Sequence, residues 1–271
     1  MGQAASGGDP RESALGLALY HPLASFLAGL RFLTILPVSW LSHTDGRFFK
    51  ASLLWFPVIG GVIGLLTAVT VSLFSPLLPA SLQAALGLVL LASISGCLHL
   101  DGLADSCDGL LSSRPRKRAL EIMRDSHAGV MGVIALFFVL LGKYAALSSM
   151  PQNEIVSVLF LMPVAGRVAI ILMMATLPYA REGDGLGRLF YSNESRRVAL
   201  MGLFFFLIIT AVFFSLPTTL ITFFTVLVTV ALFSLWCHRK LGGATGDTLG
   251  AVCELTELSV AVTLCVISGF H

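Results

Sequence analysis

The sequence predicts an all-α membrane protein: a polytopic helical bundle of about seven transmembrane helices, with an eighth, interfacial or partial helix at the N-terminus. Of the 271 residues, 56% are hydrophobic and only 12% are charged, about half the charged fraction of a soluble domain. Apolar runs long enough to span a bilayer, roughly 17–25 residues, recur along the chain. The net charge of +2 gives no indication of a nucleic-acid partner, and the expected surroundings are the lipid bilayer.

The N-terminal region divides into a tail and a first helix. Residues 1–16 are rich in Gly, Ala and Ser, a composition typical of disorder. We therefore expect a disordered tail followed by a single integral membrane catalytic domain over residues 17–271. The apolar run 17–38 contains Pro22 and Arg31, and the sequence leaves open whether it lies in the interface or enters the membrane partly.

Seven further runs have the length of a transmembrane helix. They cover 51–75, 81–100, 129–149, 155–177, 198–216, 218–236 and 250–269. The connections 75–80 and 216–219 are short and contain prolines, which are typical of helix ends, so the flanking runs form helical hairpins. Gly60 and Gly64 lie four residues apart in the first of these spans, a spacing that favours close helix packing.

The distribution of basic residues predicts the orientation. Thirteen of the seventeen Lys and Arg residues fall in four segments, 38–50, 101–128, 178–197 and 237–249. The alternate connections 76–80, 150–154 and 216–218 contain none. By the positive-inside rule the four basic segments face the cytoplasm, which places the amino terminus and every acidic cluster discussed below on that side.

Three carboxylates, Asp101, Asp105 and Asp108, follow the second spanning run in the stretch 99–109. Spacings of four and three residues place them on one face of a helix. Three carboxylates on one face repel each other unless a cation neutralises them, so we expect a site for a hard cation such as Mg²⁺, which in turn binds phosphate oxygens. Asp125 is positioned to join the site from the next turn.

The segment after this cluster is basic. Arg116, Lys117 and Arg118 are typical topology signals, although the segment also places phosphate-binding groups beside the carboxylates. His127 is interpreted equally well as a hydrogen-bonded structural residue or as a catalytic one.

A second constellation precedes and enters the last span. The glycines of 242–250 form a loop whose amides can approach a phosphate, and the following helix points its positive end at the same place. Asp247 and Glu254 are seven residues apart, again on one face. Glu254 and Glu257 lie within the apolar run, where unpaired carboxylates are costly. Direct ligation and pairing with Arg167 or Lys143, the basic residues of other spans, are both compatible with the sequence.

A third region, 179–188, is a charged cytoplasmic loop. Arg181 and Arg188 could hold diphosphate oxygens, and solvated loop charges are the alternative.

These stretches resemble the adenosylcobinamide-GDP ribazoletransferases, also called cobalamin synthases. The resemblance covers nearly the whole chain after residue 25, and its most specific part is His-Leu-Asp-Gly-Leu-Ala-Asp at 99–105. The matching stretches are 31–37, 56–64, 99–109, 123–129 and 246–251 with Glu254.

The resemblance implies that α-ribazole, or its 5′-phosphate, displaces GMP from adenosylcobinamide-GDP to form adenosylcobalamin, or its 5′-phosphate. It implies Mg²⁺ as cofactor and the bacterial inner membrane as location, with other cobalamin-assembly enzymes as candidate partners. We expect Asp101, Asp105 and Asp108 to bind Mg²⁺ and Asp125 or Asp247 to accept the proton of the attacking hydroxyl. The candidate substrate-binding residues are His99, Arg124, His127, Arg167, Arg181, Gly246 and Glu254.

Two other functions compete with this one. A CDP-alcohol phosphotransferase of lipid synthesis also places aspartates in an Asp-Gly motif at a cytoplasmic helix end, but with an Ala-Arg pair where this chain has Ala104 and Asp105. A membrane transporter would use the acids and bases within the spans as an ion path, but the acids cluster on one side and no inverted repeat is visible.

Overall fold

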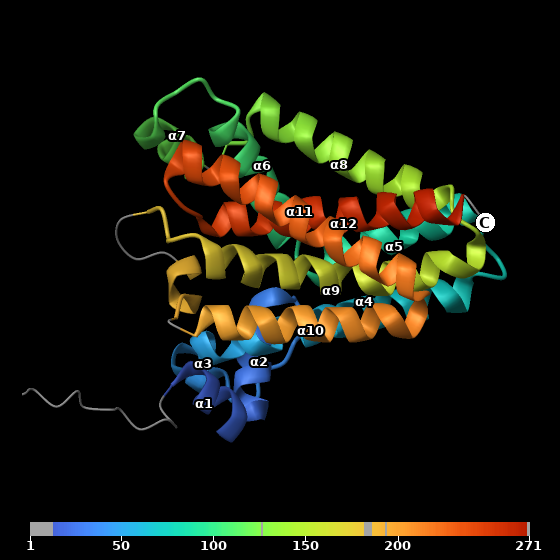
Figure 1. Cartoon of the computed structure of the whole chain (residues 1–271), viewed down its shortest axis with the longest axis horizontal. Coiled ribbons are helices and arrows are strands. Elements are labelled where there is room, and N and C mark those ends of the chain that lie inside the picture. The colour runs from blue at the N-terminus through green and yellow to red at the C-terminus, as the bar shows by residue number, and fades with distance from the viewer. Residues whose placement is uncertain (1–12, 126, 182–185, 193, 270–271) are drawn as a thin grey trace, which may run out of the picture.

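The computed structural model describes residues 13–125, 127–181, 186–192 and 194–269 and is a helical bundle (Figure 1). Its α-helices are α1 (Ala14–Tyr20), α2 (Pro22–Leu33), α3 (Asp45–Ser52), α4 (Phe56–Phe74), α5 (Ala80–Ile94), α6 (Leu98–Leu110), α7 (Arg116–Ile122), α8 (Val130–Ser148), α9 (Gln152–Thr176), α10 (Ser195–Phe213), α11 (Leu216–Leu241) and α12 (Gly246–Ser268). Three short 3-10 helices are η2 (Ser42–Thr44), η3 (Leu53–Trp55) and η4 (Leu186–Phe190). The predicted all-α class is confirmed.

The bundle has the surface of a membrane protein. Within the described ranges, six helices are long and apolar enough to cross a bilayer, or eight if the bent pairs α1–α2 and α5–α6 each count as one span. Large apolar side chains such as Phe138, Phe204 and Leu232 are exposed on the outer helices, whereas Lys143 and Arg167 are buried inside. Exposed apolar and buried charged residues are expected where the surrounding solvent is hydrocarbon.

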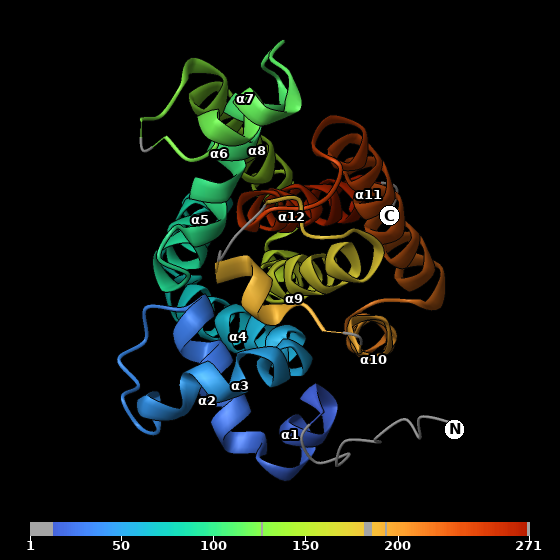
Figure 2. The same cartoon turned by 90° about the vertical axis from the view of Figure 1, so that its left-hand side faces the viewer.

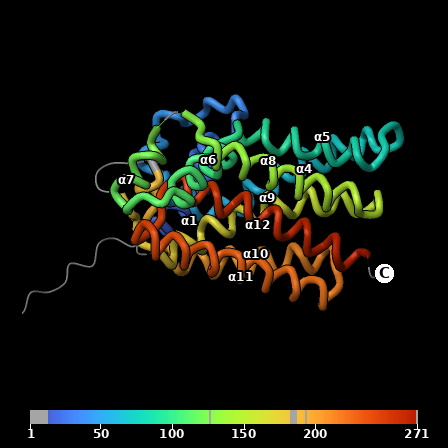
Figure 3. The backbone as a smooth tube through the Cα atoms, turned by 90° about the horizontal axis from the view of Figure 1, so that it is seen from above, coloured from blue at the N-terminus to red at the C-terminus, as the bar shows by residue number. Residues whose placement is uncertain are grey.

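The chain passes back and forth along the bundle. Figures 1 and 3 show α7 and the connection from α11 to α12 at one end, and the carboxyl terminus at the other. The short turns after α4, α8 and α10 lie at the same end as the carboxyl terminus. The predicted hairpins and the alternation of basic and uncharged connections are therefore confirmed, and the assignment of the basic end to the cytoplasm stays a prediction.

Helix α9 lies at the centre of the bundle, with α4, α10, α11 and α12 around it (Figure 2). Glycines let α4 approach it closely. A Cβ atom on Gly60 would lie 2.4 Å from the Pro163 carbonyl oxygen, and one on Gly64 would lie 2.3 Å from that of Phe160. Both distances are shorter than van der Waals contact, so the packing role predicted for these glycines is confirmed.

The second predicted span, 81–100, is not one straight helix. Helix α5 ends at Ile94, and α6 continues at an angle of 88° to it. Gly96 and Cys97 have positive φ angles of 59° and 56°, which a continuing right-handed helix does not allow. The amide of Ile35 donates to the Ile94 carbonyl over 2.9 Å, so the segment after α2 satisfies a carbonyl that the break leaves free.

The N-terminal run also differs from a simple helix. Helix α1 begins at Ala14, inside the tail expected over 1–16, because the Ser13 hydroxyl accepts from the Gly16 amide and caps it. Helices α1 and α2 are bent by 110° relative to each other. Residues 1–12 of the expected tail lie outside the described residues.

Candidate active site

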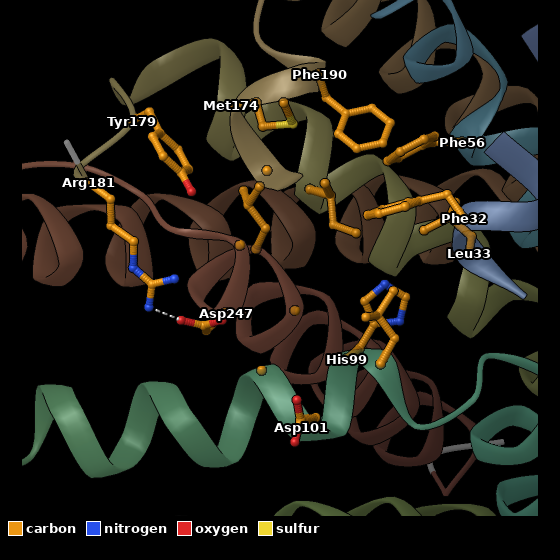
Figure 4. Close-up of a pocket in the computed structure, with 17 residues that line it drawn as sticks. Phe32, Leu33, Phe56, His99, Asp101, Met174, Tyr179, Arg181, Phe190 and Asp247 are labelled. Atoms are coloured by element: carbon orange, nitrogen blue, oxygen red, sulfur yellow. Dashed lines mark hydrogen bonds and ion pairs between the residues drawn. The ribbon is translucent and has the colours of Figure 1, made fainter. Parts of the chain in front are cut away.

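A cavity of about 280 Å³ lies where α2, α4, α6, α9, η4 and α12 meet (Figure 4). Its volume is near the lower limit of small-molecule sites, about 300 Å³. One end is lined by aromatic rings and by His99, and the other carries charged side chains from α6, α12 and the loop after α9. The charged residues that line it are Asp101, Arg181 and Asp247.

Glycines bring α6 and α12 together at this cavity. A Cβ atom on Gly102 would lie 2.8 Å from the carbonyl oxygen of Asp247, and one on Gly250 would lie 3.2 Å from the Cα of His99. With glycine at both positions the two helices cross in close contact. The carboxylate-bearing face of α6 therefore lies beside the first turn of α12.

The start of α12 is fixed by a capping box. The Thr245 hydroxyl accepts from the Thr248 amide over 3.2 Å, and the Thr248 hydroxyl accepts from the Thr245 amide over 2.8 Å. Gly246, the first helical residue, lines the cavity and has open space where a Cβ would point. A ligand can therefore approach the backbone at Gly246 without a steric clash, as predicted. This position is at the N-terminus of α12, where the helix dipole is positive.

Arg181 is held against Asp247 by the backbone. The amide of Ala180 donates to the Ala244 carbonyl, and the amide of Ala244 donates to that of Pro178, each over 2.8 Å. This pairing brings the Arg181 guanidinium 2.5 Å from the Asp247 carboxylate. The Nε atom of Arg181 is buried and has no hydrogen-bond partner in the part of the chain that the structure describes.

Four carboxylates gather around this end of the cavity. Asp101, Asp108 and Asp247 all lie close enough to Asp105 to act on its charge, and Arg181 is a cation that offsets them there. Such an excess of negative charge is costly without a further cation. Nevertheless, the described residues contain no group of three His, Cys, Asp or Glu side chains already placed to hold a metal ion.

Asp108 has structural partners. Its carboxylate accepts from the Gly129 amide over 2.8 Å and from the Gly132 amide over 2.9 Å, and it thereby caps the N-terminus of α8. Cβ atoms on Gly129 and Gly132 would lie 2.3 and 2.6 Å from its oxygens. The three aspartates share one face of α6 as predicted, but Asp108 also joins α6 to α8.

Glu254 and Arg167 belong to a separate, buried ion network. The Lys143 ammonium lies 2.6 Å from Glu254 and 2.7 Å from Glu257, and Arg167 lies 2.7 Å from Glu257. The pairing of these acids with Lys143 and Arg167, one of the two interpretations of the sequence, is confirmed. Neither Glu254 nor Arg167 lines the cavity, but Arg167 contacts His99, which does.

Asp125 and His127 lie at the surface, away from the cavity. Their side chains are 59% and 91% exposed and form a pair at 2.6 Å. The hydrogen bond from His127 lowers the pKa of Asp125. The structure therefore does not bring Asp125 into the carboxylate cluster.

Arg124 lies in a second, basic cleft. This cleft has a volume of about 700 Å³ and adjoins the cavity, since Arg181 lines both. Its other basic residues are Arg116 and Lys117. Arg116 donates to the carbonyls of Leu241 and Ala180, so this arginine also ties α7 to the loops beside α12.

The aromatic lining residues were not among the predicted site residues. Phe32, Phe56 and Phe190 come from three elements that are far apart in the sequence. Phe residues are common throughout this apolar chain, so no local pattern distinguishes these three.

Comparisons with known proteins agree on one family. Residues 25–265 match the family model described as cobalamin-5-phosphate synthase. The chain is 37% identical over 246 residues to a protein of Alkaliphilus metalliredigens, with 90% of this chain and 96% of the relative covered. It is 35% identical to proteins of Clostridium acetobutylicum and Geotalea daltonii, with 89% and 91% of this chain and 96% and 99% of the relatives covered. All three relatives are named adenosylcobinamide-GDP ribazoletransferase. No solved structure matches the chain.

Proposed function

The chain belongs to the cobalamin-5-phosphate synthase family, and on this premise we propose that it joins α-ribazole, or its 5′-phosphate, to adenosylcobinamide-GDP. The products are GMP and adenosylcobalamin, or its 5′-phosphate. The observation that carries the proposal to these residues is the cavity whose charged end combines Asp101 and Asp247 with Arg181. Such a transfer requires a carboxylate that accepts a proton and a cation that holds phosphate.

In the proposed reaction a ribose hydroxyl oxygen attacks the phosphorus that is linked to cobinamide. The bond from this phosphorus to the oxygen of GMP breaks, and GMP leaves with the electron pair. The hydroxyl proton passes to a carboxylate, and general-base catalysis of this kind contributes about 10²–10⁴-fold. We assign this role to Asp247, which lines the cavity, rather than to Asp125, which is exposed and has a lowered pKa.

Mg²⁺ is the proposed cofactor, with Asp101 and Asp105 as its protein ligands. Mg²⁺ in phosphoryl-transfer sites is typically bound by one or two carboxylates together with substrate phosphates. The two aspartates and the excess of negative charge around them fit this donor set. It does not need three protein ligands already placed around the ion. When bound, the ion would neutralise charge on the diphosphate. Asp108 is then a positioning residue, since its oxygens already accept two amides of α8.

The basic cleft is proposed to receive the nucleotide side of the diphosphate. Arg124 and Lys117 line it, and Arg181 connects it to the cavity. The Arg181 guanidinium, which lines both spaces, supports a contact to a phosphate oxygen. The His127 side chain is 91% exposed, so we assign it at most a contact with the solvent-facing part of the substrate.

We further propose that the protein resides in the bacterial inner membrane with the cavity facing the cytoplasm. This placement rests on the positive-inside rule, because the cavity opens among the basic segments. Guanine nucleotides, one of which is the leaving group, are cytoplasmic.

The test is an assay on purified membranes that contain the protein. Incubation with adenosylcobinamide-GDP, α-ribazole and Mg²⁺ should yield cobalamin and GMP, and EDTA should abolish both. Membranes with Asp247→Asn serve as the matched control and should lose activity. If CMP is released from a CDP-alcohol substrate, or solute flux occurs without nucleotide turnover, the proposal is wrong and one of the alternative functions is correct.

A further inference from the structure

The two ends of the cavity differ in chemistry (Figure 4). Phe32, Phe56 and Phe190 line one end. The ring centroid of Phe190 lies 4.5 Å from that of Phe32 and 5.5 Å from that of Phe56. Arg181 and Asp247 line the other end. A molecule that fills the cavity must therefore have an aromatic or apolar part and a polar part.

His99 supplies a hydrogen-bonding group at the aromatic end. Its Nδ1 lies 3.3 Å from Nη2 of Arg167. A guanidinium can only donate, so Nδ1 accepts and the proton of the neutral imidazole is on Nε2. Arg167 is itself held by Glu257 at 2.7 Å. The buried ion network thus fixes the tautomer of a cavity-lining residue and leaves its Nε2–H group as a donor.

We propose that the aromatic end binds the planar base of ribazole, with the Nε2–H group of His99 donating to its free ring nitrogen. This inference rests on the proposed function, which supplies the substrate. The base of ribazole is a fused benzene and imidazole ring. One of its nitrogens is bonded to ribose, the other is its single in-plane acceptor, and the remaining edge is hydrocarbon.

The fit of the ribazole base to the aromatic end and His99 predicts that the site distinguishes between nucleoside bases. A purine presents additional nitrogen and exocyclic polar groups on the edge where ribazole has hydrocarbon. These groups would be buried against Phe32, Phe56 and Phe190 without partners, and unpaired buried polar groups are costly. The site should therefore favour benzimidazole nucleosides over purine nucleosides.

The size and direction of the cavity support the same assignment. A volume of about 280 Å³ suits one small nucleoside and is much too small for adenosylcobinamide-GDP. With the base at the aromatic end, the ribose extends toward Asp247, the residue proposed to accept its hydroxyl proton. The corrinoid diphosphate then approaches from the charged end, beside the basic cleft.

A pair of phenylalanine variants tests the stacking contact. Phe190→Leu keeps an apolar side chain but removes a ring that lines the cavity. Phe49→Leu is the matched control, because the Phe49 ring lies 5.4 Å from that of Phe190 but does not line the cavity. Phe190→Leu should raise KM for α-ribazole about tenfold and leave KM for adenosylcobinamide-GDP unchanged, whereas Phe49→Leu should change neither. Phe32→Leu is the second variant if Phe190→Leu does not fold.

A pair of histidine variants tests the donor. His99→Asn keeps an amide near the Nδ1 position, where it can pair with Arg167, but loses the donor at Nε2. His99→Gln carries an amide to the Nε2 position. We expect KM for α-ribazole to rise about tenfold in the first variant and less in the second.

The outcomes separate this inference from the proposed function. If the wild-type protein makes no cobalamin, the proposed function fails. If it makes cobalamin but Phe190→Leu and Phe32→Leu retain the wild-type KM for α-ribazole, only the assignment of the aromatic end is overturned. Equal kcat/KM for α-ribazole and an α-linked purine riboside would overturn it too.

Discussion

Helix α12 contributes to two clusters of charged residues that differ in their ratio of acidic to basic side chains. Glu254 and Glu257 lie in the bundle interior with Lys143 and Arg167, so two acids face two bases. Asp247, about two turns earlier, lies with the three aspartates of α6 and one cation, Arg181. The balanced cluster is neutral within itself, whereas the unbalanced one has an excess of negative charge that the proposed Mg²⁺ would offset. We therefore propose that charge balance separates the acids that hold the fold from the acids that act on a substrate.

Loss of a basic side chain from the balanced cluster should lower the stability of the protein strongly. Lys143→Met leaves Glu254 without its ion-pair partner, and breaking a buried pair in this way costs about 3–5 kcal/mol. Thermal unfolding in detergent should show a large fall in Tm, and adding Glu254→Gln should recover part of it. Lys50→Met, at an exposed position, is the control and should unfold like the wild type. An unchanged Tm for Lys143→Met would contradict the structural role.

Substitution of an aspartate in the unbalanced cluster should lower activity but not stability. Asp105→Asn removes a proposed Mg²⁺ ligand and should lower kcat about 10²–10³-fold. Because it also relieves repulsion among the carboxylates, Tm should not fall. The measurement is GMP release at saturating Mg²⁺ beside thermal unfolding of the same sample. Full activity in this variant would remove the metal assignment.

A smaller effect is expected where the cluster is joined to α8. Gly132→Ala would place a Cβ 2.6 Å from an Asp108 oxygen and 2.8 Å from the Ala104 carbonyl oxygen. Overpacking of this kind costs about 1–3 kcal/mol, which should appear as a lower Tm. Gly46→Ala is the matched control, since a Cβ there meets nothing within 4 Å. If both variants unfold alike, the contact of Asp108 with α8 is not needed for stability.

The smallest effect is expected for Asp125→Asn. The Asp125 side chain is exposed and forms its ion pair with His127, which is more exposed still. Because Asp125 does not line the cavity, its loss should remove no interaction with the transition state, and kcat should stay within about twofold of the wild type. A loss as large as that of Asp247→Asn would instead identify Asp125 as the base.

Local sequence patterns were sufficient to predict much of this protein. Apolar length predicted the spans, since a helix must be long enough to cross hydrocarbon. The spacing of Asp101, Asp105 and Asp108 predicted a shared helical face, because helical periodicity is a local property. Basic residues predicted which connections lie together, and the motif at 99–105 indicated the family that the comparisons then established.

Only the tertiary structure decided how these parts combine. The break at Gly96 and Cys97 depends on backbone angles that composition does not reveal. The aromatic end brings together rings from α2, α4 and η4, and the division of the α12 acids depends on which cations lie opposite them. These are contacts between segments distant in the chain, so their chemistry is determined by packing rather than by the spacing of residues in the sequence.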